Sequence, residues 1–347
     1  MRPPLTVRLA PFGTSVFAEM TALAIEHDAI NLGQGFPDFD GPASVMDAAM
    51  AAMRDGHNQY APMPGVPELR GAVAGHQHRF YGLEHDPATE VTVHAGATGA
   101  LAATLQALLD PGDEAIIFEP YYDAYRPGIS LAGARERVVR LAPPDFTFDP
   151  AELEAAVGPK TRLLLWNSPN NPAGKVFSRA EVETIADVCV RHDLLAITDE
   201  VYEHIVFEGE HIPLATLPGM RDRTVTISSA GKTFSFTGWK IGWACGPADL
   251  VAACNAAHQF LSFAVARPLQ VAMAHALDTF QGDYLAEFRA AYTERRDLLV
   301  DALREAGFDV AVPQGTYFVC ASHRPLSDKD DRSFAEELIE RVGVASI

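Results

Sequence analysis

The feature that most restricts the fold of this chain is a series of short apolar runs separated by helical segments. The runs are too short to be core helices, and most are apolar at successive positions rather than at alternate ones. Strands that are apolar on both faces are typical of a mostly parallel sheet covered by helices on both sides. We therefore predict an α/β fold with strands at 91–95, 115–118, 137–141, 162–166, 194–198 and 224–228.

Helical segments alternate with these strands. Residues 67–80 begin with a proline in the first turn, which is a common helix start. Ser178 is followed three residues later by Glu181, the spacing of a capping box, so a helix should begin there. Beyond residue 247 the chain is mainly helical, with a small antiparallel strand pair expected at 308–313 and 316–320.

This order of segments predicts a large α/β domain and a smaller α+β domain, as the length of 347 residues allows. We place an N-terminal arm with part of the small domain at 1–43, the large domain at 44–275, and the remainder of the small domain at 276–347.

Charge and cysteine content exclude several classes of partner and site. The 46 acidic residues exceed the 27 basic ones by 19, and this excess would repel nucleic acids and anionic membranes. The N-terminus lacks the apolar run of a signal peptide, so we expect a cytoplasmic protein. The four cysteines are scattered and lack the spacing of a metal site; we expect buried thiols, and no metal, for Cys189, Cys245, Cys254 and Cys320.

Polar residues follow several of the predicted strands, at the edge where α/β sheets bind ligands. A small-residue turn, Gly96 to Gly99, precedes a helix whose free N–H groups could hold a phosphate. Asp199 directly follows the strand at 194–198, and Lys232 follows the strand at 224–228. A lysine among apolar neighbours has a lowered pKa and can attack an aldehyde as a neutral amine.

Each of these features alone has an ordinary structural explanation: a turn, a helix cap or a surface lysine. The segment Gly231-Lys232-Thr233 is also not a P-loop, because Thr226 stands where that motif requires a glycine. Their combination at the ends of several strands favours a binding site.

Five longer segments resemble the class I/II aminotransferases, which are pyridoxal-phosphate (PLP) enzymes of fold type I. Within that family the resemblance is to the kynurenine/methionine aminotransferase branch, and it runs collinearly from about residue 15. It implies a large PLP-binding domain and a homodimer with shared active sites. The segments are NLGQGFPDFDGP, NQYAPMPGVPELR, SPNNPAGKVF, ITDEVYEHI and SSAGKTFSFTGWKIGW.

The resemblance implies roles for the reacting groups and for the cofactor. Lys232 would be the Schiff-base lysine and would move the proton, Asp199 would pair with the pyridine nitrogen, and Asn171 and Tyr202 would contact the ring hydroxyl oxygen. Lys232, Asp199 and Tyr202 form the expected catalytic set. The phosphate would be held by Ala97, Thr98, Ser229 and Lys240.

The resemblance also implies contacts around the ring and the substrate. Tyr122 would stack on the ring, and Tyr60 would reach the phosphate of the neighbouring subunit. Gly35 would line the substrate carboxylate, with Asn171 also at the substrate. Phe36 and Phe263 are the expected apolar pocket residues.

The function implied is transfer of an amino group from a neutral L-amino acid to a 2-oxo acid by a ping-pong mechanism. Methionine, aromatic amino acids or kynurenine would fit the expected aromatic pocket. Two alternatives on the same fold stay open: a cysteine-conjugate C–S β-lyase, and a diaminopimelate-type aminotransferase, which would need further cations in the pocket. An alternative of another class is a non-catalytic binding or regulatory protein.

Two further expectations concern residues outside these motifs. His204 and Glu203 should be structural, while His76 and His211 are expected at the surface. In the resembled family an arginine near the C-terminus holds the substrate carboxylate. Residues 343–347 look like the start of the run that precedes it, so we expect the sequence to be a fragment of a longer protein.

Overall fold

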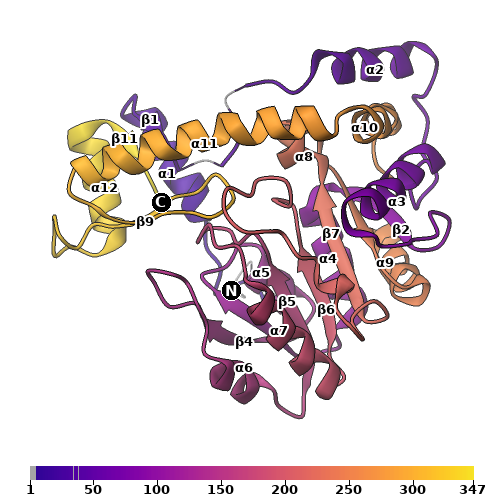
Figure 1. Ribbon diagram of the computed structural model, residues 1–347, viewed down its shortest axis with the longest axis horizontal. Helices are drawn as coiled ribbons and strands as arrows, with labels where there is room; N and C mark the ends of the chain where they lie inside the picture. The colour runs from indigo at the N-terminus through magenta and orange to yellow at the C-terminus, as the bar shows by residue number, and fades with distance from the viewer. Residues whose placement is uncertain (1–4, 34, 38) are drawn as a thin grey trace.

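The fold is described from a computed structural model of the chain, covering residues 5–33, 35–37 and 39–347. In this part of the chain a seven-stranded sheet has the order β2-β8-β7-β6-β5-β3-β4, and β8 is the strand antiparallel to its neighbours. This strand order confirms the predicted α/β fold with a mostly parallel sheet, and Figure 1 shows the sheet with helices around it. The strands are β2 (Val91–Ala95), β3 (Glu114–Glu119), β4 (Arg135–Arg140), β5 (Thr161–Asn167), β6 (Leu195–Asp199), β7 (Thr224–Ser229) and β8 (Ile241–Cys245).

Helices cover both faces of the sheet because its central strands are apolar on both sides. In β5, Leu163 and Leu165 pack in one cluster with α4 and α9, whereas Leu164 and Trp166 pack in another with α6 and α7. This division follows from the alternation of side chains along a strand. The helices are α4 (Gly96–Leu108), α5 (Tyr125–Leu131), α6 (Pro150–Ala156), α7 (Arg179–Arg191) and α9 (Ala248–Leu261).

Another set of helices packs near β2 and β8, at one side of the sheet. Leu69 and Val73 of α3 belong to the same apolar cluster as Val93 of β2 and Met273 of α10. The helices are α2 (Ala43–Arg54), α3 (Pro67–Tyr81), α10 (Arg267–Thr279) and the short α8 (Ala230–Thr233).

The first and last parts of the described chain lie together, and α11 (Gly282–Glu305) runs along the molecule toward them (Figure 1). Strand β1 (Ile30–Asn31) pairs in parallel with β11 (Val344–Ala345), and α1 (Val16–Glu26) packs with α12 (Asp331–Val342). The division of the chain into domains at residues 43 and 275 stays a prediction.

Most predicted elements agree with the structure to within a few residues, and the capping box of Ser178 and Glu181 is present. The second strand of the small antiparallel pair was wrongly placed. The pair is formed by β9 (Asp309–Ala311) and β10 (Cys320–Ser322), because Thr316 has a positive φ of 64° and turns the preceding segment away from an extended course.

Three statements about burial need correction. His76 and His211 are buried, not at the surface, because each has a polar partner from another segment. Cys320 is only half-buried, while the other three cysteines are buried.

No helix in the described chain is long and apolar enough to cross a membrane.

Candidate functional site

A pocket of about 350 Å³ lies where the carboxyl ends of the parallel strands meet. Strand β8 runs the opposite way, so its first residue pairs with the last residue of β2. Lys240, which immediately precedes β8, therefore reaches the same edge of the sheet and lines the pocket.

The structure brings ten of the residues predicted from sequence together in this pocket. They come from segments that are far apart along the chain, and each lies at the end of a strand of the sheet or in a segment next to one, apart from Gly35 in the N-terminal region. The ten lining residues are Gly35, Ala97, Thr98, Tyr122, Asn171, Asp199, Tyr202, Ser229, Lys232 and Lys240.

The carboxylate of Asp199 is buried at the end of β6. The Tyr125 hydroxyl donates a hydrogen bond of 2.7 Å to its Oδ2 atom, and the Val201 N–H donates one of 3.4 Å to Oδ1. Burial raises the pKa of Asp199 to about 6, although these hydrogen bonds oppose the increase. The carboxyl group is therefore largely ionised at neutral pH and can pair with a cation.

Asn167 connects this segment to the loop after β5. Its Nδ2 donates to the main-chain oxygen of Asp199 at 2.7 Å, and its Oδ1 accepts from the Asn171 N–H at 2.6 Å. Asn171 is thereby fixed to the same edge of the sheet as the carboxylate.

The amine of Lys232 projects into the pocket from α8. Its Nζ donates to the Gly35 carbonyl at 3.2 Å and to the Tyr317 hydroxyl at 2.5 Å. Burial lowers its pKa to about 8; Asp199 opposes this decrease and Lys240 adds to it. A substantial neutral fraction is thus present at neutral to mildly alkaline pH, as a nucleophilic amine requires.

The first turn of α4 supplies an anion-binding region beside this amine. Among the described residues no side chain caps the helix, so its first N–H groups are free to bind a ligand. Gly96 adopts a φ of +70°, and a Cβ there would lie 3.1 Å from Nζ of Lys240. This close approach places the ammonium group next to the helix terminus.

Three predicted residues do not line this pocket. Phe36 is 58% exposed, Tyr60 is 81% exposed and Phe263 is 48% exposed. The rings of Tyr60 and Phe263 pack edge to face at 5.3 Å, so these two form a surface pair.

Sequence reasoning missed Tyr125, Tyr317 and Asn167, which contact the predicted residues directly. It also missed two aromatic lining residues, Phe17 and Phe318. Asn167 could have been found, because it directly follows the predicted strand at 162–166. Neither tyrosine follows a predicted strand directly, so no comparable signal marked them.

Comparison with known proteins agrees with the fold and with the set of lining residues. The family described as aminotransferase class I and II matches residues 27–347. The chain is 50% identical over 343 residues to the probable N-succinyldiaminopimelate aminotransferase DapC of Mycobacterium tuberculosis H37Rv, covering 98% of this chain and 86% of the relative. It is 41% identical over 341 residues to the methionine aminotransferase of Escherichia coli K12, covering 98% of this chain and 88% of the relative.

Solved structures give the same result. The N-succinyldiaminopimelate aminotransferase of M. tuberculosis superimposes with a TM-score of 0.96 at 49% identity, covering 98% of this chain and 89% of the other. The E. coli protein YbdL is described as having a methionine aminotransferase function. It superimposes with a TM-score of 0.94 at 40% identity, covering 99% of this chain and 90% of the other. This chain therefore belongs to the class I and II aminotransferases, the PLP-dependent transaminases of fold type I.

Proposed function

We propose that Lys232 holds the PLP cofactor and that the enzyme uses it to transfer amino groups from a neutral L-amino acid to a 2-oxo acid. The observation that carries this proposal is the convergence, in one pocket, of a buried amine, a buried carboxylate and an uncapped helix terminus. These match the aldehyde, the ring nitrogen and the phosphate of the cofactor. When bound, PLP supplies an electron sink for the bonds at the substrate Cα.

The surrounding residues fit the remaining parts of the cofactor. Asn171 and Tyr202 would donate hydrogen bonds to the ring oxygen, and Tyr122 would lie against the ring. The phosphate would receive N–H groups of the first turn of α4, at Ala97 and Thr98, with Ser229 and the Lys240 charge beside it.

With cofactor and substrate bound, the Lys232 side chain would be available as a free amine lining the pocket. Its lowered pKa suits it to take the proton from the substrate Cα at Nζ and to return it as a general acid. The ionised Asp199 would stabilise a protonated ring nitrogen, since the buried carboxylate has few other cationic partners.

The lining of the pocket favours a substrate with a neutral side chain. Phe17 and Phe318, which are not assigned to the cofactor, supply aromatic surface. The lysines among the described lining residues are Lys232 and Lys240, and both are assigned to the cofactor. A methionine or aromatic side chain fits this environment better than a carboxylate does.

A second candidate substrate is N-succinyl-diaminopimelate, favoured by the 50% identity to the M. tuberculosis relative. A third possibility is β-elimination from a cysteine conjugate, which the same pocket could support. Pyruvate formation without added oxo acid identifies elimination, whereas transamination requires the oxo acid.

The deciding experiment follows the visible absorbance of the cofactor-loaded enzyme during addition of single amino acids. Methionine or phenylalanine should change the spectrum at low concentration, and the Lys232→Ala variant should give no comparable turnover. A response to the succinylated substrate alone would favour the second candidate, and no response to any amino donor would refute the proposal.

We also propose that the enzyme is a cytoplasmic homodimer. Two exposed apolar residues at the C-terminus of α9, Phe260 (86% exposed) and Leu261, precede Phe263 of the Tyr60–Phe263 pair and offer an apolar surface for a second copy. In such a dimer Tyr60 would reach the partner's phosphate, while Phe36 and Phe263 would complete a substrate pocket. The four free thiols fit a reducing compartment. Light scattering of purified protein tests the dimer, which a monomeric mass at micromolar concentration would refute.

A further inference from the structure

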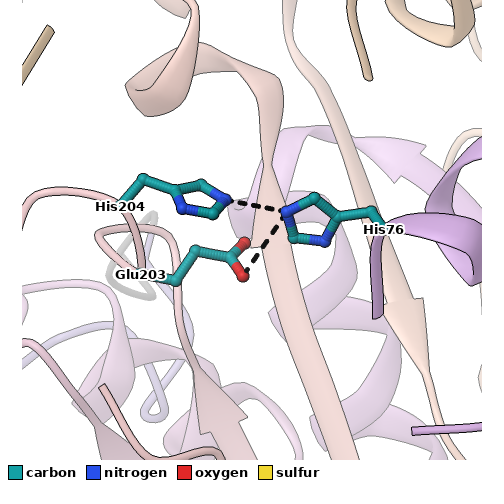
Figure 2. A group of neighbouring side chains, drawn as sticks. All are labelled: His76, Glu203 and His204. Carbon is teal, nitrogen blue, oxygen red and sulfur yellow. Dashed lines mark hydrogen bonds and ion pairs between the residues drawn. The ribbon is translucent and has the colours of Figure 1, made fainter. Parts of the chain in front are cut away.

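A second cluster of polar side chains lies outside the cofactor pocket, between α3 and the loop after β6. Figure 2 shows His76 from α3 facing Glu203 and His204 from that loop. Nε2 of His76 is 2.7 Å from Nε2 of His204 and 3.9 Å from Oε2 of Glu203. One potential ligand atom from each residue lies within 4.8 Å of the others, so small side-chain movements would bring all three into contact with a single ion.

The carboxylate of Glu203 is held in place by two donors. The Tyr81 hydroxyl donates to Oε2 at 2.6 Å, and the Ser228 hydroxyl donates to Oε1 at 2.6 Å. Each carboxylate oxygen has a second lone pair, so these bonds orient the group and still leave it able to accept a cation. Outer hydrogen bonds of this kind are typical of metal-binding carboxylates.

The two imidazoles are neutral, the form in which histidine binds a metal. Burial lowers the pKa of both His76 and His204 to about 3, and Arg79 lowers that of His76 further. Two neutral rings with facing Nε2 atoms have two ways to avoid repulsion. Either one ring donates an N–H to the other, or both lone pairs point at a cation.

We propose that His76, Glu203 and His204 bind a divalent transition metal, with zinc the best match, and that water completes the coordination. Two imidazoles and one carboxylate form a common zinc ligand set, with an open fourth position. Zinc–nitrogen bonds of about 2.0–2.1 Å in tetrahedral geometry separate two imidazole nitrogens by about 3.3 Å. The rings must therefore move apart by about 0.6 Å, and the half-buried His204 is the one with room to do so.

The cluster can be reached from solvent. Glu203 and His204 line a surface pocket of about 460 Å³. His211 lines it as well, but its Nε2 is already paired with Glu200 at 2.9 Å, so it is not assigned as a ligand. Arg179 and Arg289 share this pocket, and their charges should make binding weaker than at a site without nearby cations.

A metal at this position would tie α3 to the loop that carries Tyr202. Because the ion would bind the folded state and not the complete set of ligands in the unfolded chain, it should raise thermal stability. The inference concerns a site separate from the cofactor pocket, and it does not depend on the proposed substrate.

Zinc binding to the cofactor-loaded protein tests the proposal. Protein treated with chelator and desalted is titrated with Zn²⁺ against a chromogenic chelator, and with Co²⁺ while its visible absorption is recorded. We expect one equivalent of metal per chain and a rise in Tm. His204→Gln and His76→Gln should each weaken zinc binding at least tenfold and remove the rise in Tm.

The matched control is His192→Gln, which removes an exposed histidine paired with Glu154 and should leave zinc binding unchanged. If His76→Gln fails to fold, the zinc affinity of His204→Gln, a change at the half-buried residue that lines the surface pocket, tests the proposal alone. The proposal is overturned if no stoichiometric zinc binds, or if zinc binds both variants as tightly as the unmodified protein. In that case the two rings are joined only by a hydrogen bond.

Discussion

The Tyr125 hydroxyl favours the ionised form of Asp199 and opposes the effect of burial on the pKa of that carboxyl group, and it can be removed without changing the ring. Tyr125 is fully buried, and its hydroxyl donates to Oδ2 of Asp199 at 2.7 Å. In Tyr125→Phe the carboxylate loses this donor and keeps the longer bond from the Val201 N–H. The ionised form is thereby destabilised relative to the protonated form.

The size of the effect follows from the strength of that bond. A hydrogen bond to a charged group contributes about 1.5–3 kcal/mol, and about 1.4 kcal/mol corresponds to a tenfold change in ionisation. The pKa of Asp199, about 6 in the structure, should therefore rise by about 1 to 2. At pH 6 about half of the original carboxyls are ionised, against less than about a tenth in the variant.

The assay is the affinity of the cofactor-free protein for PLP between pH 5.5 and about 9, followed by visible absorbance. Because an ionised Asp199 favours the protonated ring nitrogen, affinity should fall as pH decreases through the pKa of this group. The variant should begin to lose affinity about 1 to 2 pH units higher, and bind about five- to fiftyfold more weakly at pH 6. Protonation of free PLP also changes with pH, but it changes the measured affinity of both proteins by the same factor.

Tyr121→Phe is the matched control for this experiment. Tyr121 precedes the same helix, but its hydroxyl accepts a bond from Arg126 and does not contact Asp199. Its pH profile should coincide with that of the unmodified protein. If Tyr125→Phe also coincides, the hydrogen bond does not set the ionisation of Asp199 and the reasoning is refuted.

Three other changes test separate parts of the site and fold. Lys232→Ala should abolish both the visible cofactor absorbance and turnover, and a normal rate would exclude its assigned role. Gly96→Ala forces a side chain into a left-handed conformation beside Lys240, so denaturant unfolding should show a loss of about 1–2 kcal/mol, with weaker phosphate binding. Tyr317→Phe removes one contact to the Lys232 amine, worth about 1 kcal/mol, and should lower kcat about fivefold while cofactor absorbance persists.

The sequence predicts site residues that lie at the ends of parallel strands or within a few residues after them. Asp199 and Lys232 were placed in this way, because strand ends can be recognised locally and parallel strands bring them to one edge. Lys240 was assigned only through the family resemblance. Its strand, β8, was not predicted, since its place depends on antiparallel pairing with β2 and β7, which are distant in sequence.

Residues that act through long-range contacts could not be predicted in the same way. Tyr317 reaches Lys232 from 85 residues further along the chain, and Tyr125 reaches Asp199 across 74 residues. His76 was wrongly expected at the surface because the polar partner that compensates its burial, His204, is 128 residues away. A local pattern contains no information about such partners.

The loop after β6 connects the cofactor pocket to the histidine cluster through consecutive residues. Tyr202 lines the pocket, while Glu203, the next residue, bonds to Ser228 on β7. Ser228 is in turn adjacent to Ser229, which faces the pocket from the strand that leads to Lys232. The Glu203–Ser228 bond therefore joins, behind the pocket, the two segments that carry Tyr202 and Lys232. A metal bound to Glu203 and His204 would act on Tyr202 through the peptide chain and on the segment before Lys232 through the Glu203–Ser228 hydrogen bond, in both cases as a positioning effect.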